Sequence, residues 1–198
     1  YGAGEGEVLV QTPRLGEFRR LYSWKAGKLA PISPDVKADV ISFTIDAKKR
    51  RIVYETNEGG YTRLHAIDAR SYEPVAMPAM PEADHVRQGA TTFDGRYTTI
   101  AIETPTSPGR AYVLDWQTKK LVAWHAPSAP EIDTTRFAKA TLEEYRARDG
   151  AMIPMFVRRP AACAAPCPVI MAFHGGPEAQ AKPGFNTRAQ LFVDAGYV

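Results

Sequence analysis

Short runs in which apolar and polar residues alternate fill the first two thirds of the chain. Residues 41–46 alternate strictly between the two classes, and residues 52–56 and 61–68 follow as further strand-like runs. A cluster of turn formers, Asn57-Glu58-Gly59-Gly60, separates the last two. A period of two is that of a strand with one buried face. The pattern therefore predicts an antiparallel β-meander.

The same order of strands and turns recurs further along the chain. Residues 99–104 and 111–115 are strand-like, with a turn predicted at Pro108-Gly109, and a weaker copy opens the chain at residues 8–12 and 20–24. Three acidic residues recur at matching places: Asp46 and Asp94, Glu55 and Glu103, and Asp68 and Asp115, at offsets of 48, 48 and 47 residues. These offsets indicate an internal repeat.

Repeats of about 40 to 50 residues made of short antiparallel strands are typical of β-propeller blades. We therefore interpret residues 1–137 as the C-terminal part of a β-propeller with two to three blades, and we expect further blades upstream because so few cannot close a ring. A β-sandwich whose hairpins line up by chance is the alternative. The chain is thus expected to be mainly β.

The pattern changes after the proline-rich stretch at residues 127–130, and residues 138–198 form a second region. Residues 152–157 are strand-like, and residues 168–173 are apolar without alternation, as expected of a strand covered on both faces. Residues 187–197 predict a helix with Thr187 as its N-cap, Gln190 three positions on, and Gly196 as its stop. Its apolar face is expected to contain Leu191, Phe192 and Ala195.

The triplet His174-Gly175-Gly176, followed by Pro177, comes directly after the predicted buried strand. Open α/β sheets bind ligands at the carboxyl ends of their strands. Two adjacent glycines allow positive φ and close approach of the backbone, so peptide N–H groups can face a developing negative oxygen. We therefore predict an oxyanion-hole loop at this position. For His174 itself a structural role is favoured over a hydrogen bond to the oxyanion.

Residues 171–178, Met-Ala-Phe-His-Gly-Gly-Pro-Glu, resemble the opening of the peptidase domain in prolyl oligopeptidase and acylaminoacyl-peptidase relatives. Pro183-Gly184-Phe185-Asn186, Gln190 and residues 195–198 extend this resemblance. It implies a β-propeller followed by the first strands and helix of an α/β-hydrolase domain. It also implies a serine peptidase that acts on short peptides through a Ser-Asp-His triad.

The resemblance places the catalytic triad outside these 198 residues. No Gly-x-Ser-x-Gly occurs in the chain, and the triad of this family follows the loop at His174. We therefore expect no catalytic residue here, a triad downstream, and the remainder of the peptidase domain as a partner. An esterase with the same loop is an alternative enzyme. The alternative from another class is a non-catalytic β-propeller binding protein with a vestigial hydrolase segment.

Two further features bear on sites. Glu178, next to the loop, is a candidate for binding a substrate amino group, with an ordinary surface carboxylate as the alternative. Cys163 and Cys167 lie in a loop of small residues and predict a disulfide if the protein is exported, which favours a periplasmic or secreted location. Inert thiols are the alternative. Zinc is disfavoured because no second pair exists and the four histidines are scattered.

Composition excludes several classes of function. The formal charge of +3 is small, so nucleic acid is not expected as a partner. No apolar run approaches the roughly 20 residues that span a bilayer, so no membrane segment is expected. No metal and no cofactor are expected. Nothing in the sequence indicates an oligomeric state.

Overall fold

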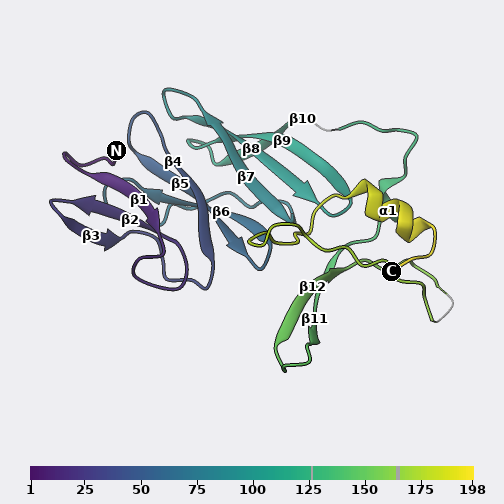
Figure 1. Cartoon of the computed structure of the whole chain (residues 1–198). Helices are drawn as coiled ribbons and strands as arrows, with labels where there is room; N and C mark the ends of the chain where they lie inside the picture. The colour runs from purple at the N-terminus through teal and green to yellow at the C-terminus, as the bar shows by residue number, and fades with distance from the viewer. Residues whose placement is uncertain (126, 164–165) are drawn as a thin grey trace. The chain divides into compact units, whose positions relative to one another are not determined.

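The structure is a computed structural model that describes residues 1–125, 127–163 and 166–198 (Figure 1). The chain folds as two compact units. The first comprises Tyr1–Ile102 and Arg110–Ala126, and the second comprises Glu103–Gly109 and Pro127–Val198. The described elements of both units are β1 (Val8–Thr12), β2 (Arg20–Lys25), β3 (Lys28–Pro31), β4 (Asp39–Ile45), β5 (Arg51–Glu58), β6 (Tyr61–Asp68), β7 (His85–Thr91), β8 (Tyr97–Thr104), β9 (Ser107–Asp115), β10 (Lys120–His125), β11 (Thr141–Arg146), β12 (Met152–Val157), a 3-10 turn at Thr134–Arg136, and helix α1 (Thr187–Asp194).

The predicted meander of residues 41–68 is confirmed as β4, β5 and β6. All three strands are antiparallel, with Ile45 opposite Ile52 and Glu58 opposite Tyr61. A two-residue connection, Gly59-Gly60, joins β5 to β6, and both glycines have positive φ. This is the geometry that a tight hairpin turn requires, and glycine adopts it without strain. The turn cluster seen in the sequence therefore closes a hairpin.

The weaker copy at the start of the chain also forms strands. Strands β1, β2 and β3 make a separate antiparallel sheet in that order, with Val8 opposite Trp24 and Tyr22 opposite Pro31. The third set of strands, β7 to β10, continues the sheet of β4 to β6 through a single parallel bridge between Thr62 and His85.

One predicted turn lies elsewhere. The reversal between β8 and β9 falls at residues 105–106, whereas Pro108 and Gly109 belong to β9. Both Pro-Thr and Pro-Gly can occupy a turn, and the sequence offered both within five residues. The choice was made by strand pairing, which extends β9 back to Ser107. The prediction of a turn at Pro108-Gly109 was therefore wrong by three residues.

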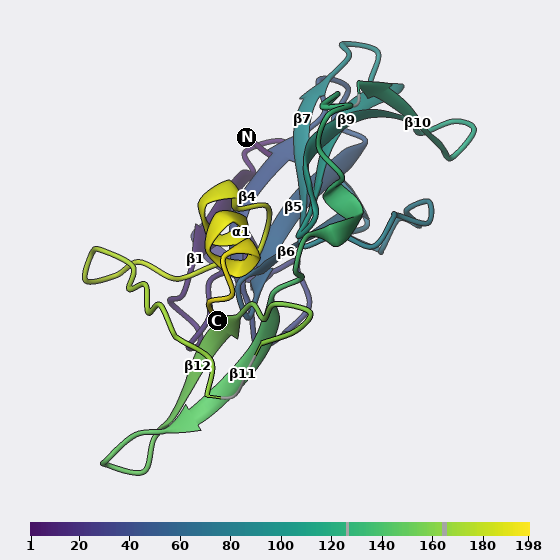
Figure 2. The same cartoon turned by 90° about the vertical axis from the view of Figure 1, so that its right-hand side faces the viewer.

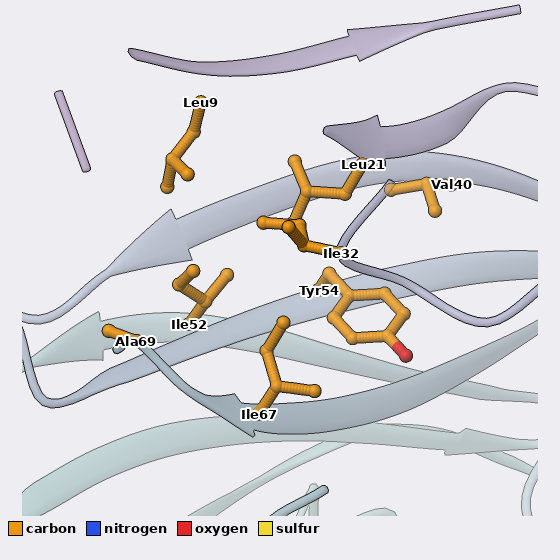
Figure 3. Packing of buried hydrophobic residues seen from close by; sticks show 8 residues of the cluster. All are labelled: Leu9, Leu21, Ile32, Val40, Ile52, Tyr54, Ile67 and Ala69. Atoms are coloured by element: carbon orange, nitrogen blue, oxygen red, sulfur yellow. The ribbon is translucent and has the colours of Figure 1, made fainter. Parts of the chain in front are cut away.

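Two hydrophobic clusters hold successive sets of strands together. The first joins the β1–β3 sheet to the faces of β4, β5 and β6, and Figure 3 shows its side chains pointing toward one another. Its buried members are Leu9, Leu21, Ile32, Val40, Ile52, Tyr54, Ile67 and Ala69. Burying a side chain of this size contributes about 1.5–3 kcal/mol, so this cluster is a main source of stability for the first unit.

The second cluster lies on the opposite face of β5 and β6. Val53 and Ala66 alternate with the residues of the first cluster, and they pack against Ile100, Ile102 and strand β9. Ile100 and Ile102 lie 48 residues after Ile52 and Tyr54. At these equivalent positions of the repeat, both pairs pack against the set of strands that precedes their own. The central meander is thus covered on both faces by the sets of strands before and after it.

The second unit contains the hairpin of β11 and β12 and helix α1 (Figure 2). Thr141 pairs with Val157 and Arg146 with Met152, and the connecting turn includes Gly150 at positive φ. The strand predicted at residues 152–157 is therefore confirmed with its bounds. No described helix of the chain combines the length and the apolar character that crossing a bilayer requires.

Candidate functional site

The segment before the His174 loop is extended but is not buried. Val169 is 63% exposed and Phe173 is 82% exposed, so the prediction of a strand covered on both faces was wrong. Among the described residues, its backbone pairs only with the end of the chain. An apolar run predicts that a strand can be covered, but burial depends on the elements packed against it. Here no such element lies on either face within the described ranges.

This segment nevertheless makes one parallel bridge. The amide of Val198 donates to the carbonyl of Pro168 at 2.9 Å, and the amide of Ile170 donates to the carbonyl of Val198 at 2.8 Å. Two such bonds around Val169 are the pattern of neighbouring parallel strands. Residues 168–170 and Val198 therefore begin a parallel pair, and the chain between them includes helix α1.

Helix α1 makes the crossover between the two extended segments. Its N-cap is Asn186, whose side chain accepts a hydrogen bond from the Ala189 amide at 3.0 Å, so the prediction of Thr187 as the cap was wrong by one residue. Asparagine and threonine both serve as N-caps, and adjacent ones cannot be ranked by residue type. The predicted stop is confirmed, because Gly196 has a φ of 89°.

The end of α1 turns the chain back with a complete C-capping motif. The amide of Tyr197 donates to the carbonyl of Phe192 at 3.0 Å, and the amide of Gly196 donates to that of Val193 at 2.9 Å. These are the two bonds of a Schellman motif, and the rings of Phe192 and Tyr197 supply its apolar contact at 6.3 Å. The motif places Val198 where it can pair with residue 169.

The buried face of α1 differs from the predicted one. Leu191 is 70% exposed and Phe192 is 40% exposed, whereas Gln190 is 2% exposed and Val193 is 7% exposed. Gln190 accepts a hydrogen bond from the amide of Ala138 and donates one to its carbonyl, each at 2.9 Å. A buried amide side chain is stable when its donor and acceptor are both used, which explains this orientation.

The predicted oxyanion-hole loop follows the parallel segment directly. His174 is exposed, and its Nδ1 lies 2.9 Å from the carbonyl oxygen of Gly175. A carbonyl can only accept, so this bond requires the Nδ1–H tautomer of the ring. The side chain of His174 thus bonds to the backbone of its own loop, an arrangement that fits the structural role favoured from the sequence.

Gly176 has a conformation that needs glycine. Its φ is 131°, and a Cβ at this position would lie 2.8 Å from the amide nitrogen of Ala179 and 2.9 Å from that of Glu178. Gly175, by contrast, has no positive φ, and a Cβ added there would meet no atom within 4 Å. Within the described ranges the amides of both glycines donate to no acceptor, so they are available to a negatively charged oxygen.

The other candidate residues are not brought to this loop by any contact. Glu178 is exposed and forms no ion pair with another described residue. Cys163 and Cys167 are joined as a disulfide, with 5.8 Å between their Cα atoms, which is an ordinary separation for bridged cysteines. The described part of the chain holds no group of three or more histidine, cysteine or acidic side chains able to bind a metal.

A shallow depression that sequence motifs did not indicate lies on the first unit. Its volume is about 350 Å³, and Tyr97, Tyr112 and Trp124 contribute its aromatic lining together with residues of β7, β8 and β9. Trp124 is 79% exposed. None of the residues predicted to form a site lines this depression.

Comparison of the sequence with protein-family models and with curated proteins found no match. Comparison of the structure with solved structures gave clear similarity. A structure from a study of two prolyl endopeptidases has a TM-score of 0.82 and 18% identity over 98% of this chain. Prolyl oligopeptidase B from Galerina marginata, bound to a 35mer substrate, has a TM-score of 0.78 and 16% identity over 96%. Porphyromonas gingivalis dipeptidyl peptidase 4 has a TM-score of 0.76 and 14% identity over 98%.

The chain covers between 28% and 29% of the length of these three proteins, so it corresponds to a stretch of less than a third of each. Identities this low show a shared fold. The predicted resemblance to the prolyl oligopeptidase group and the expectation of a mainly β chain are thereby confirmed. The mainly β chain has the fold of a fragment of prolyl oligopeptidases and dipeptidyl peptidase 4.

Proposed function

We propose that this chain is part of a serine peptidase that hydrolyses short peptides. In this proposal residues 1–137 are the C-terminal part of a β-propeller, with blades formed by β1–β3, β4–β6 and β7–β10. Residues 138–198 are the N-terminal part of an α/β-hydrolase peptidase domain. The similarity to prolyl oligopeptidases and dipeptidyl peptidase 4 supports this assignment.

The two hydrophobic clusters support the three blades. Each cluster lies between one set of antiparallel strands and the next. The middle set, β4–β6, has a neighbour on each side and packs both of its faces. In a propeller, every blade packs face to face against the blades before and after it. A single bridge between Thr62 and His85 joins the last two sets, so side-chain packing is the main connection between them.

The position of the His174 loop is the observation that carries the enzymatic proposal. The loop follows the carboxyl end of an extended segment that is paired in parallel with Val198 through the crossover helix α1. In α/β-hydrolases, one donor of the oxyanion hole comes from such a loop, and the nucleophile lies on a later strand. The amides of Gly175 and Gly176, which donate to no acceptor within the described ranges, are donors of the required kind.

The chemistry of the proposed reaction follows from these donors. A serine oxygen attacks the carbonyl carbon of the peptide while a histidine accepts the serine proton, and the carbonyl oxygen becomes negatively charged. Amides at residues 175 and 176 would stabilise that charge, a contribution of about 2.7–4 kcal/mol for one such donor in other enzymes. The histidine then returns the proton to the leaving amine as the C–N bond breaks, which leaves an acyl-serine. Water, deprotonated by the same histidine, attacks that ester, releases the acid product and restores the serine. Serine, aspartate and histidine would come from sequence following Val198.

The carboxylate of Glu178 is the proposed contact for a free amino group of the substrate. It is exposed, it lies two residues after Gly176, and no described cation neutralises it. A carboxylate in this position can pair with an ammonium group. Substrates with a free N-terminus would then be preferred over acetylated ones.

The coding sequence beyond Val198 and a labelling experiment test the proposal together. We expect a Gly-x-Ser-x-Gly followed by aspartate and histidine, and stoichiometric labelling of the longer protein by a fluorophosphonate. The 198-residue chain is the control and should remain unlabelled. A longer protein that lacks the motif and resists labelling would overturn the proposal in favour of a non-catalytic binding protein. Labelling of the 198-residue chain would show that its nucleophile has been missed.

A further inference from the structure

One position of the repeat carries a polar side chain that binds the backbone of the next set of strands. Glu55, on β5, accepts a hydrogen bond from the amide of Gln88, on β7, at 2.8 Å. Gln11, on β1, is its equivalent in the first copy and donates to the carbonyl of Val40, on β4, at 2.6 Å. Strands β4 and β7 each begin the following set. This position therefore fastens one set of strands to the next.

The residue type at this position matches its backbone partner. The partner of Gln11 is a carbonyl, and the glutamine uses its amide nitrogen as a donor. The partner of Glu55 is an amide, and the glutamate, which has no donor when ionised, accepts from it. Glu55 is buried, so its hydrogen bond also satisfies a carboxylate that would be costly to leave unpaired.

Glu103 occupies the third copy, 48 residues after Glu55. Its Oε1 accepts a hydrogen bond from the amide of Phe185 at 2.9 Å. Phe185 is not on a strand, because it lies in the loop immediately before the N-cap of α1. Glu103 and Phe185 both belong to the second unit. In the third copy the side chain therefore binds the loop that precedes helix α1, whereas in the first two copies it binds a strand.

Other contacts hold the same loop at adjacent residues. Arg158 donates from Nη2 to the carbonyl of Gly184 at 2.6 Å. The rings of Phe137 and Phe185 lie with their centroids 5.8 Å apart. Gln190 ties α1 to Ala138, the residue that follows Phe137. The entry to α1 is therefore fixed by side chains from several separate parts of the second unit.

We propose that Glu103 is a positioning residue that fixes the start of α1 by binding the amide of Phe185. Because α1 leads through its C-capping motif to Val198, fixing its start also favours the pairing of Val198 with the segment that carries the His174 loop. Any consequence for peptide hydrolysis rests on the proposed function. The positioning itself does not, because it concerns hydrogen bonds of this chain alone.

Amide hydrogen exchange in the ¹⁵N-labelled chain, followed by NMR, tests the proposal. In Glu103→Asp the carboxylate is retained but is one methylene shorter, so the bond to Phe185 should be lost and its amide should exchange about tenfold faster or more. Glu103→Gln keeps an acceptor oxygen at the original reach and should preserve most of the protection. Comparing these two variants distinguishes the effect of side-chain length from the effect of the negative charge.

Glu55→Asp is the matched control, since it makes the equivalent change one set of strands earlier. It should accelerate exchange at Gln88 and leave Phe185 unchanged, whereas Glu103→Asp should do the reverse. Unchanged protection of Phe185 in Glu103→Asp would overturn the proposal. Equal acceleration at Phe185 in both variants would also overturn it, because that outcome indicates general loss of stability. None of these readouts depends on peptidase activity, so failure of the proposed function would leave them unaffected.

Discussion

The side chain of Gln190 is paired with the backbone of Ala138 through both of its polar atoms. The two bonds are each 2.9 Å long and join residues 52 positions apart in the sequence. Gln190 is 2% exposed, so the pair is shielded from water. This contact connects helix α1 to the segment between the 3-10 turn and β11. It gives the second unit a specific polar link between segments far apart in the sequence.

Replacing Gln190 by leucine should destabilise the second unit. The variant loses both hydrogen bonds and leaves the amide and carbonyl of Ala138 without their partner, a cost of about 1–3 kcal/mol. Urea unfolding followed by circular dichroism measures this difference. Leu191→Gln is the matched control because Leu191 is exposed on the same helix, and it should change the free energy of unfolding by less than about 0.5 kcal/mol. Equal effects of the two variants would contradict the role of Gln190.

Glu7 should make the stability of the first unit depend on pH. Burial alone would raise its pKa, but hydrogen bonds from the hydroxyls of Ser23 and Tyr72 and from the amide of Gly4 outweigh burial and lower the pKa below its ordinary 4.5. A lowered folded-state pKa contributes stability that is present above the unfolded value and is lost as pH falls through the folded value. Glu7 therefore stabilises the chain at neutral pH.

The variant Glu7→Gln tests this dependence. At pH 7 it should lower the free energy of unfolding by about 1–3 kcal/mol, because hydrogen bonds to a charged acceptor are replaced by weaker ones. The difference from the wild type should shrink below about pH 4 as the carboxylate is protonated. Glu5→Gln, at an exposed neighbouring position, serves as the control. A difference that stays constant from pH 7 to pH 3 would be inconsistent with this account.

Gly176 should tolerate substitution poorly and Gly175 well. An alanine at residue 176 would need a φ near 131° and would place its Cβ 2.8 Å from the amide nitrogen of Ala179. Such strain costs about 1–3 kcal/mol or forces the loop into another conformation. Chemical shifts of the amides of residues 174–179 report the loop directly. Gly176→Ala should change them strongly and Gly175→Ala only slightly, whereas similar changes in both variants would argue against the described loop.

The bond between Cys163 and Cys167 has a direct chemical readout. Alkylation with iodoacetamide without reductant should add no mass to the chain, and alkylation after reduction should add two adducts. The protein has to be prepared under oxidising conditions, because a reducing cytosol would keep both thiols free. Two adducts before reduction of such a sample would show that the bridge does not form.

The strands of the repeat were predictable where their alternation matches their packing. In β4, Phe43 and Ile45 pack against the first cluster and alternate with the polar Ser42 and Thr44, so local alternation and long-range packing agree. The recurrence of Glu55 as Glu103 was also visible in the sequence. The change of partner from Gln88 to Phe185 was not visible, since nothing local distinguishes one backbone amide from another.

The second region was predicted less accurately for a related reason. An apolar run such as residues 168–173 indicates a capacity for burial, which only neighbouring elements can satisfy. Gln190 was assigned to a capping box because its spacing from Thr187 fits that motif, but the cap is Asn186 and the glutamine binds Ala138. A partner 52 residues away leaves no local signature. The loop at His174 could be proposed from the sequence because two adjacent glycines are a local signature.

The exposed run ending at Phe173 has a consequence for handling the protein. Residues 169–173, Val-Ile-Met-Ala-Phe, carry no charge, and within the described ranges their backbone bonds only to Val198. Short uncharged stretches of this composition seed cross-β assembly when their edges are accessible. Stored solutions of the 198-residue chain should therefore lose monomer to aggregates that bind thioflavin T. Lysine at residue 171, as in Met171→Lys, should slow that loss by introducing charge into the run.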